Sequence, residues 1–367
     1  YTGSRSIIHR VIQIDFSSIS AFLTGFSTYP QPLRLRLRIF TIFFLYKQTH
    51  QAVRKGELST IMKLVFDKAD LVKSVGIAMK AVSGKTTMPI LECILIDASS
   101  NVIKFTSNDM ELGIETIVTG MILERGIVAL DAKIFSEIVR KLPDNQVTIE
   151  TDENLVTTIT CEKAKFNIPG QSGEDFSYLP ILETSDCVSI SQFTLKELIR
   201  QTIFSIAANE NNKLMTGELF EIKDNTLRVV SLDGHRIAIR RIELKDSYPD
   251  RKVVVPGKTL NEISKILSGE MDDQIDIYFS ENHIMFKFDD TTVVSRLIDG
   301  EYFRIDQMLS SDYETKVTIN KKEFLSCIDR ATLLVKEGDK KPIIIDIQDG
   351  TMELQINSAM GSMKEEI

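Results

Sequence analysis

The apolar and polar positions of this chain follow a pattern that recurs along its length. Three segments, starting at Leu64, Ile190 and Val317, begin with a short alternating stretch and continue with apolar residues three and four positions apart. Alternation predicts a strand, and the wider spacing predicts a helix with one buried face. The pairs that align the segments are Asp70-Leu71, Glu197-Leu198 and Glu323-Phe324, at separations of 127 and 126 residues. The expected core positions are Leu71, Val75 and Ala78; Leu198, Thr202 and Ile206; and Phe324, Ile328 and Ala331.

A second unit follows the first one in the pattern. The segment 128–142 resembles 253–267, and within it Lys133 matches Lys258 and Glu137 matches Glu262. Alternating stretches that predict strands come after both segments, at 147–150 with 155–160 and at 275–278 with 283–288. The unit is therefore strand, helix, strands, and it occurs twice in each domain of about 125 residues, as expected for a repeat architecture.

The repeated units predict an α+β fold and divide most of the chain into similar domains. The expected domains are 62–185, 186–312 and 313–367, the last being only the first half of a domain. In this third domain a helix over 321–335 precedes strands at 342–348 and 352–357, so that five units are present where the repetition predicts six. A half domain is expected to leave an apolar helix face and a strand edge uncovered.

Residues 1–61 do not match the repeats. They hold eight Lys/Arg and two acidic residues, a net charge of +6. Because the whole chain has a net charge of −8, the remaining 306 residues have a net charge of −14. The change falls at Met62, the first methionine of the chain. We interpret the segment as an extension outside the fold, from a start site assigned too early or from translated flanking DNA. A genuine basic appendage is the alternative.

The composition argues against a metal centre, a disulfide framework and a membrane span. Four cysteines and four histidines are scattered, without the C-x-x-C spacing of redox or zinc sites, and the cysteines are expected to be reduced and buried. The longest apolar run, 39–46, is far shorter than the roughly 20 residues that a spanning helix needs. We expect no metal, no cofactor and no membrane.

The stretch Ser231-Leu-Asp-Gly-His-Arg-Ile237 predicts a β-hairpin, because Asp-Gly lies between apolar strand positions. A two-residue turn would place Asp233 and Gly234 at positive φ. His235 and Arg236 then allow three interpretations: a catalytic cluster, a strand that presents polar side chains to a partner, or a solvated hairpin tip. The equivalent stretch of the first domain, 106–112, keeps the aspartate as Asp109 but replaces His and Arg. Both aspartates are therefore expected to be turn residues, and we predict no catalytic residues.

The segment Val82-Ser-Gly-Lys-Thr-Thr87 has the end of a phosphate-binding loop but not its beginning. The first glycine of that motif would fall on Met79, and without it the backbone cannot wrap a triphosphate. A nucleotide site is therefore rejected, and an ATP- or Mg-dependent enzyme, a third possible function, has only this incomplete motif behind it.

Basic residues concentrate on or beside the repeated helices. Lysine on a helix is usually solvated, but here the rest of the chain is acidic, which indicates an enclosed polyanion. These residues are Lys73, Lys80, Lys133, Arg140, Lys141, Lys196, Arg200, Lys258, Lys265, Lys321 and Lys322.

From Met62 onward the chain resembles the bacterial DNA polymerase III beta subunit family, the replication sliding clamps. The resemblance rests on the motifs Met62-Lys-Leu-Val-Phe66, Lys85-Thr-Thr-Met-Pro-Ile-Leu91, Ser231–Ile237, Val253-Val-Val-Pro-Gly-Lys258 and Leu297-Ile-Asp-Gly300. It covers 62–367 and implies a C-terminally truncated chain. It also implies a ring of two subunits with three similar domains each, with helices lining the hole and sheets outside.

The resemblance implies three groups of site residues. The implied DNA contacts are Lys85, Lys133, Asn209, Asn212, Lys213 and Lys258, of which Asn212 and Lys213 differ in type from the family. The implied partner-peptide groove is lined by Met215, Leu232, Gly234, His235, Arg236, Ile237, Phe303, Gln307 and Met308, with Phe303 where the family often has proline. The implied dimer contacts are Phe166 and Ile168 on one subunit and Leu333 and Leu334 on the other.

The resemblance implies a non-enzymatic cytoplasmic protein associated with the nucleoid. As a homodimer it would encircle duplex DNA without sequence preference and tether the polymerase catalytic subunit for processive synthesis. The clamp loader and other replication and repair proteins would dock in the same groove. The alternative is a truncated peptide-binding scaffold that does not close around DNA.

Overall fold

The computed structural model describes residues 61–84, 86–182, 187–208, 212–309, 312–336, 338 and 341–367. The chain divides into two compact units, Tyr1–Tyr302 and Phe303–Ile367, and each is described by itself. Two of the sequence-derived site residues, Lys85 and Asn209, lie outside the described residues, as does the 1–60 segment.

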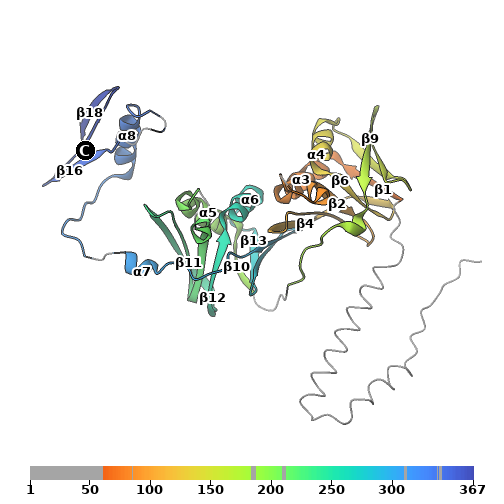
Figure 1. Cartoon of the computed structure of the whole chain (residues 1–367), viewed down its shortest axis with the longest axis horizontal. Coiled ribbons are helices and arrows are strands. Elements are labelled where there is room, and N and C mark those ends of the chain that lie inside the picture. The colour runs from red at the N-terminus through yellow and green to blue at the C-terminus, as the bar shows by residue number, and fades with distance from the viewer. Residues whose placement is uncertain are drawn as a thin grey trace, which may run out of the picture. The chain divides into compact units, whose positions relative to one another are not determined.

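The first unit contains two similar copies of a domain, and each copy holds the strand–helix–strands pattern twice (Figure 1). The first copy consists of β1 (Met62–Asp67), α3 (Lys68–Ala78), η1 (Met79–Ala81), η2 (Pro89–Glu92), β2 (Cys93–Asp97), β3 (Ile103–Asn108), β4 (Leu112–Val118), β5 (Met121–Glu124), β6 (Ile127–Asp131), α4 (Ala132–Lys141), β7 (Gln146–Thr151), β8 (Val156–Cys161), β9 (Ala164–Gln171) and η3 (Gly173–Asp175). The second consists of β10 (Cys187–Ser191), α5 (Gln192–Thr202), η4 (Ile203–Ser205), η5 (Lys213–Thr216), β11 (Gly217–Leu232), β12 (Ile237–Pro256), α6 (Gly257–Ile266), β13 (Gln274–Phe279), β14 (His283–Phe288) and β15 (Thr291–Arg296). Helix α3 packs beside α4, and α5 packs beside α6.

Each of these strands passes into its helix without a loop, and in α3, α4 and α5 the last residue before the helix caps it with its side chain. The side chain of Asp67 accepts from the Ala69 N–H at 2.9 Å, and Asp131 accepts from the Ile134 N–H at 2.7 Å. Ser191 caps α5 in the same way. Such caps satisfy backbone donors that have no partner inside the helix. In α6 the equivalent position is Pro256, which offers no side-chain cap.

The two copies share one antiparallel sheet. Among the described residues this sheet has 13 strands, in the order β10-β13-β14-β15-β4-β3-β2-β6-β9-β8-β7-β1-β5. Strand β4 of the first copy pairs with β15 of the second, with Ile114 opposite Val293. Backbone bonds extend the seam at both ends, from Ile117 N to Asp290 O at 2.9 Å and from Arg296 N to Glu111 O at 2.8 Å.

Each copy has its own apolar core, made by the inward faces of its helices and strands. In the first core Phe66, Phe105 and Phe135 are fully buried and meet edge to face at centroid distances of 6.0 and 6.1 Å. The expected core positions Leu71, Val75 and Ala78 are buried, as are Leu198 and Thr202, whereas Ile206 is only half-buried. Cys93, Cys161 and Cys327 are buried free thiols, as expected, but Cys187 is partly exposed.

The second unit consists of α7 (Ile305–Met308), α8 (Lys321–Thr332), β16 (Ile344–Gln348), β17 (Thr351–Ser358) and β18 (Gly361–Glu366). The strands form one sheet in chain order. The strand predicted from Val317 is wrong, because 317–320 have no regular secondary structure. Its counterparts β1 and β10 pair with β7 and β13, which follow the second helix of their copies, and the described part of this unit has no such strand. Strand β18 was not expected.

No helix in the described ranges is long and apolar enough to cross a membrane.

Candidate functional site

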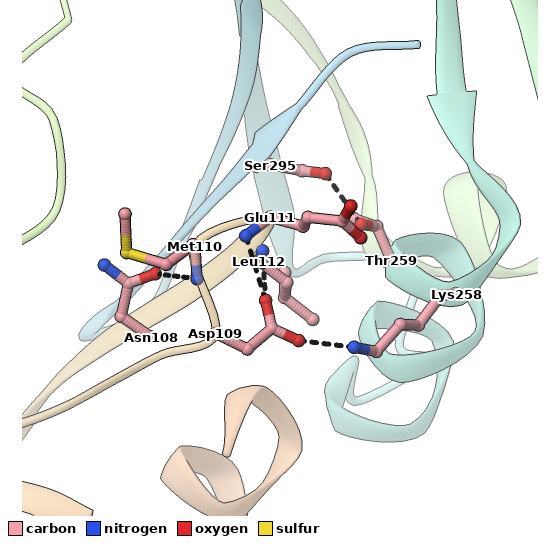
Figure 2. A network of polar contacts seen from close by, with 8 residues as sticks. All are labelled: Asn108, Asp109, Met110, Glu111, Leu112, Lys258, Thr259 and Ser295. Carbon is pink, nitrogen blue, oxygen red and sulfur yellow. Dashed lines mark hydrogen bonds and ion pairs between the residues drawn. The ribbon is translucent and has the colours of Figure 1, made fainter. Parts of the chain in front are cut away.

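The hairpin turn at Asp233 and its copy at Asp109 have the same local geometry. The Asp233 carboxylate accepts the backbone N–H groups of His235 and Arg236 at 3.0 and 3.1 Å. The Asp109 carboxylate accepts the backbone N–H groups of Glu111 and Leu112, at 3.0 and 2.7 Å (Figure 2). The residue after the aspartate has positive φ in both, 88° at Gly234 and 74° at Met110. Both aspartates are therefore turn residues, as the internal comparison predicts.

The expectation of positive φ at Asp233 is wrong, since only Gly234 of this pair has it. The two central residues of the turn are Gly234 and His235, and Asp233 and Arg236 are its outer residues, because the backbone N–H of Asp233 donates to the Arg236 carbonyl at 3.3 Å. Glycine at the first turn position alone is the pattern of a type II′ hairpin. The predicted strands on either side are confirmed as β11 and β12.

Arg236 is held at the hairpin by two neighbours. Its Nε donates to Asp233 Oδ2 at 2.9 Å, and its guanidinium lies 5.5 Å from the centre of the Phe204 ring. The pKa of Asp233 is lowered, mainly by the hydrogen bond from the backbone N–H of His235, and Arg236 contributes to the same shift. The carboxylate is thus engaged by the turn and by arginine, an arrangement that fixes a side chain rather than one that transfers protons.

The sequence-derived groove residues fall in both compact units. Leu232 is buried at the end of β11, Gly234, His235 and Arg236 are exposed, and half-buried Ile237 begins β12. Half-buried Met215 lies on η5, which packs against β11. Phe303, Gln307 and Met308 belong to the second unit, where Gln307 and Met308 are exposed on α7.

Phe204 contacts Arg236 and is a residue that sequence reasoning missed. It is 56% exposed on η4, and its ring lies against Arg236. Its contact spans 32 positions of the chain, and an aromatic residue at the end of an amphipathic helix is usually interpreted as core. The sequence therefore carried no separate signal for this role.

Lys133 and Lys258 occupy the same position in α4 and α6, the second residue of each helix, as the alignment of the two segments predicts. Both are exposed. The ammonium of Lys258 forms an ion pair with Asp109 of the other copy (Figure 2). Lys258 also borders an open hollow of about 520 Å³ between α3, α4 and α6, together with Lys80, Arg140 and Glu262.

The two other described DNA-contact candidates lie at η5. Asn212 is exposed, and its side-chain oxygen accepts from the Leu214 N–H at 3.1 Å, so that it caps this short helix. Lys213 is the exposed first residue of η5. Capping engages the amide oxygen of Asn212, which leaves its amide nitrogen as the group that faces solvent.

The dimer candidates differ in exposure. On β9 Phe166 is 39% exposed, whereas Ile168 is buried within the first core. In the second unit Leu333 is 74% exposed after α8, and Leu334 is half-buried. Phe166 and Leu333 are therefore the members of this set that present apolar surface.

Glu218 is a fully buried acid beneath the second helix pair. Its Oε2 accepts from Thr202 Oγ1 at 3.0 Å, while its Oε1 has no hydrogen-bond partner among the described residues. Burial raises the pKa of this carboxyl to about 8, against the smaller lowering effect of Thr202. The described residues also contain no group of three His, Cys, Asp or Glu placed to hold a metal ion.

Comparisons with known proteins agree with this geometry. Residues 62–180 match the family model of the DNA polymerase III beta subunit N-terminal domain, and 189–303 match that of its central domain. The beta sliding clamp of Staphylococcus epidermidis is 33% identical over 316 residues, which cover 84% of each protein.

Solved structures show the same fold. A putative DNA polymerase III beta subunit from Eubacterium rectale superimposes with a TM-score of 0.82 at 70% identity, over 83% of this chain and 84% of that one. The sliding clamp of Bacillus subtilis gives 0.79 at 35% identity, over 84% and 83%. The chain belongs to the DNA polymerase III beta subunit family, the bacterial DNA sliding clamps. The resemblance and the α+β clamp fold predicted from the sequence are confirmed.

Proposed function

We propose that the chain closes into a ring with a second copy of itself, encircles double-stranded DNA and tethers the catalytic subunit of DNA polymerase III. The observation that carries this proposal is the equivalence of Lys133 and Lys258, exposed at the same position of equivalent helices. Outside residues 1–61 the chain is strongly acidic, so that cations repeated on one class of helix suit a polyanion. The proposal includes the division into domains at 62–185, 186–312 and 313–367.

The DNA contacts in this proposal go to phosphates. Lysine ammonium groups and asparagine amides bind phosphate oxygens without reading base edges, so that binding is independent of sequence and a ring is free to slide. The residues assigned to this role are Lys85, Lys133, Asn209, Asn212, Lys213 and Lys258.

The groove at the hairpin is assigned to partner peptides. Arg236, held by Asp233 and Phe204, is an orientated cation beside apolar residues, which suits a short peptide with an apolar anchor and a polar backbone. The proposed partners are the polymerase catalytic subunit, the clamp loader and other replication and repair proteins. Tethering raises the effective concentration of polymerase at its template.

The role needs no chemistry from the chain. We assign it as a non-catalytic processivity factor without a cofactor, working in the cytoplasm at the nucleoid. The engagement of Asp233 by its turn and by Arg236 supports this assignment.

Loading onto circular and linear DNA tests the ring. The full chain is loaded by a clamp loader with ATP onto nicked circular plasmid, which is then split into an intact sample and one linearised by a restriction enzyme. A ring is expected to remain on the circle through gel filtration and to leave the linear form by its ends. Equal retention on both forms would instead identify a peptide-binding scaffold that does not encircle DNA.

A further inference from the structure

Lys258 has an acidic partner that its equivalent Lys133 lacks. The Lys258 ammonium pairs with Asp109, whose side chain is 6% exposed, while the lysine side chain remains 59% exposed. The described residues give Lys133 no ion pair, although it sits at the same position of the equivalent helix. The two lysines therefore have the same position in the repeat but different electrostatic surroundings.

The helix ends explain why an acid is needed at Lys258. A cation near the start of a helix lies at the positive end of the helix dipole, which is unfavourable. In α4 the capping residue Asp131 supplies a negative charge from its own strand. In α6 the equivalent residue is Pro256, whose side chain has neither a charge nor an acceptor. Asp109 supplies the missing charge from the turn between β3 and β4, across the seam between the copies (Figure 2).

Asp109 is fixed so that it holds the lysine in place. One carboxylate oxygen accepts the backbone N–H groups of Glu111 and Leu112, and the other receives Lys258. The turn is anchored by the bond from Arg296 N to Glu111 O at 2.8 Å. Beside it Thr259, the next residue of α6, meets Ser295 of β15 at 2.7 Å. The carboxylate therefore has a defined position, while the exposed lysine is free to exchange partners.

We propose that Asp109 is a positioning residue that competes with DNA phosphate for Lys258. This inference rests on the proposed contact between Lys258 and DNA. With DNA absent, the Asp109 carboxylate is the ion-pair partner of the Lys258 ammonium and holds it at the seam. With DNA present, a phosphate takes over part of that interaction. A lysine that is already paired with a carboxylate neutralises less phosphate charge and so releases fewer counterions from DNA. Lys258 therefore contributes less than Lys133 to affinity and to its salt dependence. The surface around Lys258 is therefore expected to bind DNA more weakly than the surface around Lys133.

Equilibrium binding to a short linear duplex, measured by fluorescence anisotropy over a range of KCl concentrations, tests this competition. Asp109→Asn keeps the oxygen that accepts the two turn N–H groups and removes the charge. It is expected to tighten binding about twofold to fivefold at low salt, the range of an exposed ion pair. The slope of log K against log[KCl] is expected to steepen by up to about 0.9, the value for one phosphate contact. Asp109→Ser is a second variant that also keeps an acceptor.

Lys258→Gln, alone and combined with Asp109→Asn, separates the possible outcomes. It is expected to reduce the slope more in the Asp109→Asn background than in the wild type. Asp152→Asn is the matched control, because Asp152 also accepts two turn N–H groups, from Asn154 and Val156. An Asp109→Asn variant that binds like the wild type, or no more tightly than Asp152→Asn, overturns the competition. If Lys258→Gln changes nothing in either background, the proposed DNA contact of Lys258 fails as well.

Discussion

At the scale of single residues, one local structure serves two different purposes. Asp109 and Asp233 make the same backbone contacts, but the second carboxylate oxygen reaches Lys258 in the first case and Arg236 in the second. The neighbouring residue, not the turn, decides whether the aspartate pairs with Lys258 or with Arg236. Equivalent positions of a repeat thus keep their backbone role while their outward chemistry diverges.

The raised pKa of buried Glu218 predicts that the free energy of unfolding falls as pH rises. Below about pH 4.5 the carboxyl is protonated in both folded and unfolded chains. Between that value and about 8 it ionises only when unfolded. The unfolded chain then binds fewer protons, so that the free energy of unfolding declines through this window, by an amount on the order of a few kcal/mol.

Substitution of Glu218 by Gln tests this dependence. The amide keeps an acceptor for Thr202 and does not ionise. In urea denaturation at pH 5, 6, 7 and 8, the variant is expected to lose less stability than the wild type across the series. Glu243→Gln, at an exposed acid, is the control and should follow the wild type. Parallel curves for Glu218→Gln and wild type would show that this carboxyl is ionised in the folded protein.

At the scale of the elements, the two equivalent turns adopt positive φ at the same position with different residues. Positive φ is easily adopted by glycine and strains a residue with a Cβ. The second copy places Gly234 there, whereas the first copy places Met110. Both hairpins keep the same geometry, so the surrounding pairing of β3 with β4 and of β11 with β12 determines the turn.

Gly234→Ala is expected to lower the free energy of unfolding by about 1–2 kcal/mol, because alanine is strained at φ 88° although the space around it is open. Met110→Gly, in the equivalent turn, is expected not to destabilise. Chemical denaturation of both variants measures the difference. Gly84→Ala, at an exposed glycine outside that φ range, should leave stability unchanged. A Gly234→Ala variant as stable as the wild type would mean that the hairpin rearranges.

The sequence predicts the repeated elements because their signals are local. Strand alternation and helical spacing lie within a few residues of the structure that they determine. The alignment of Lys133 with Lys258 predicts their common position at the start of a helix. The turn at Asp233 follows from its internal copy. Positive φ is predicted for both Asp233 and Gly234, but only Gly234 has it.

Contacts between distant parts of the chain could not be predicted in this way. Asp109 and Lys258 are 149 residues apart, and no periodic pattern connects them. The predicted strand at Val317 fails for a related reason, since a strand is stable only with a neighbour to pair with. Burial of Glu218 on β11 also goes against its type, because acids are rarely fully buried without a partner.

At the scale of the whole molecule, we propose that the ring closes through Phe166 and Ile168 of one subunit and Leu333 and Leu334 of the other. The double variant Leu333→Lys/Leu334→Lys is expected to be monomeric, because two charges would be buried in an apolar contact. Light scattering of the full chain gives the mass. Leu325→Lys, at a 53% exposed leucine of α8, is the control and should stay dimeric. An unchanged dimer mass for the double variant would contradict the assigned interface.

The pairing of β4 with β15 has a mechanical consequence. Five residue pairs, from Thr291 with Thr116 to Ser295 with Leu112, join the two copies through their backbones. A force that bends the molecule at this joint has to break hydrogen bonds in series along a continuous sheet, so the joint is stiff. If the proposed ring opens to admit DNA, this backbone-bonded joint is therefore expected to stay closed, and the gap is expected to form elsewhere in the ring.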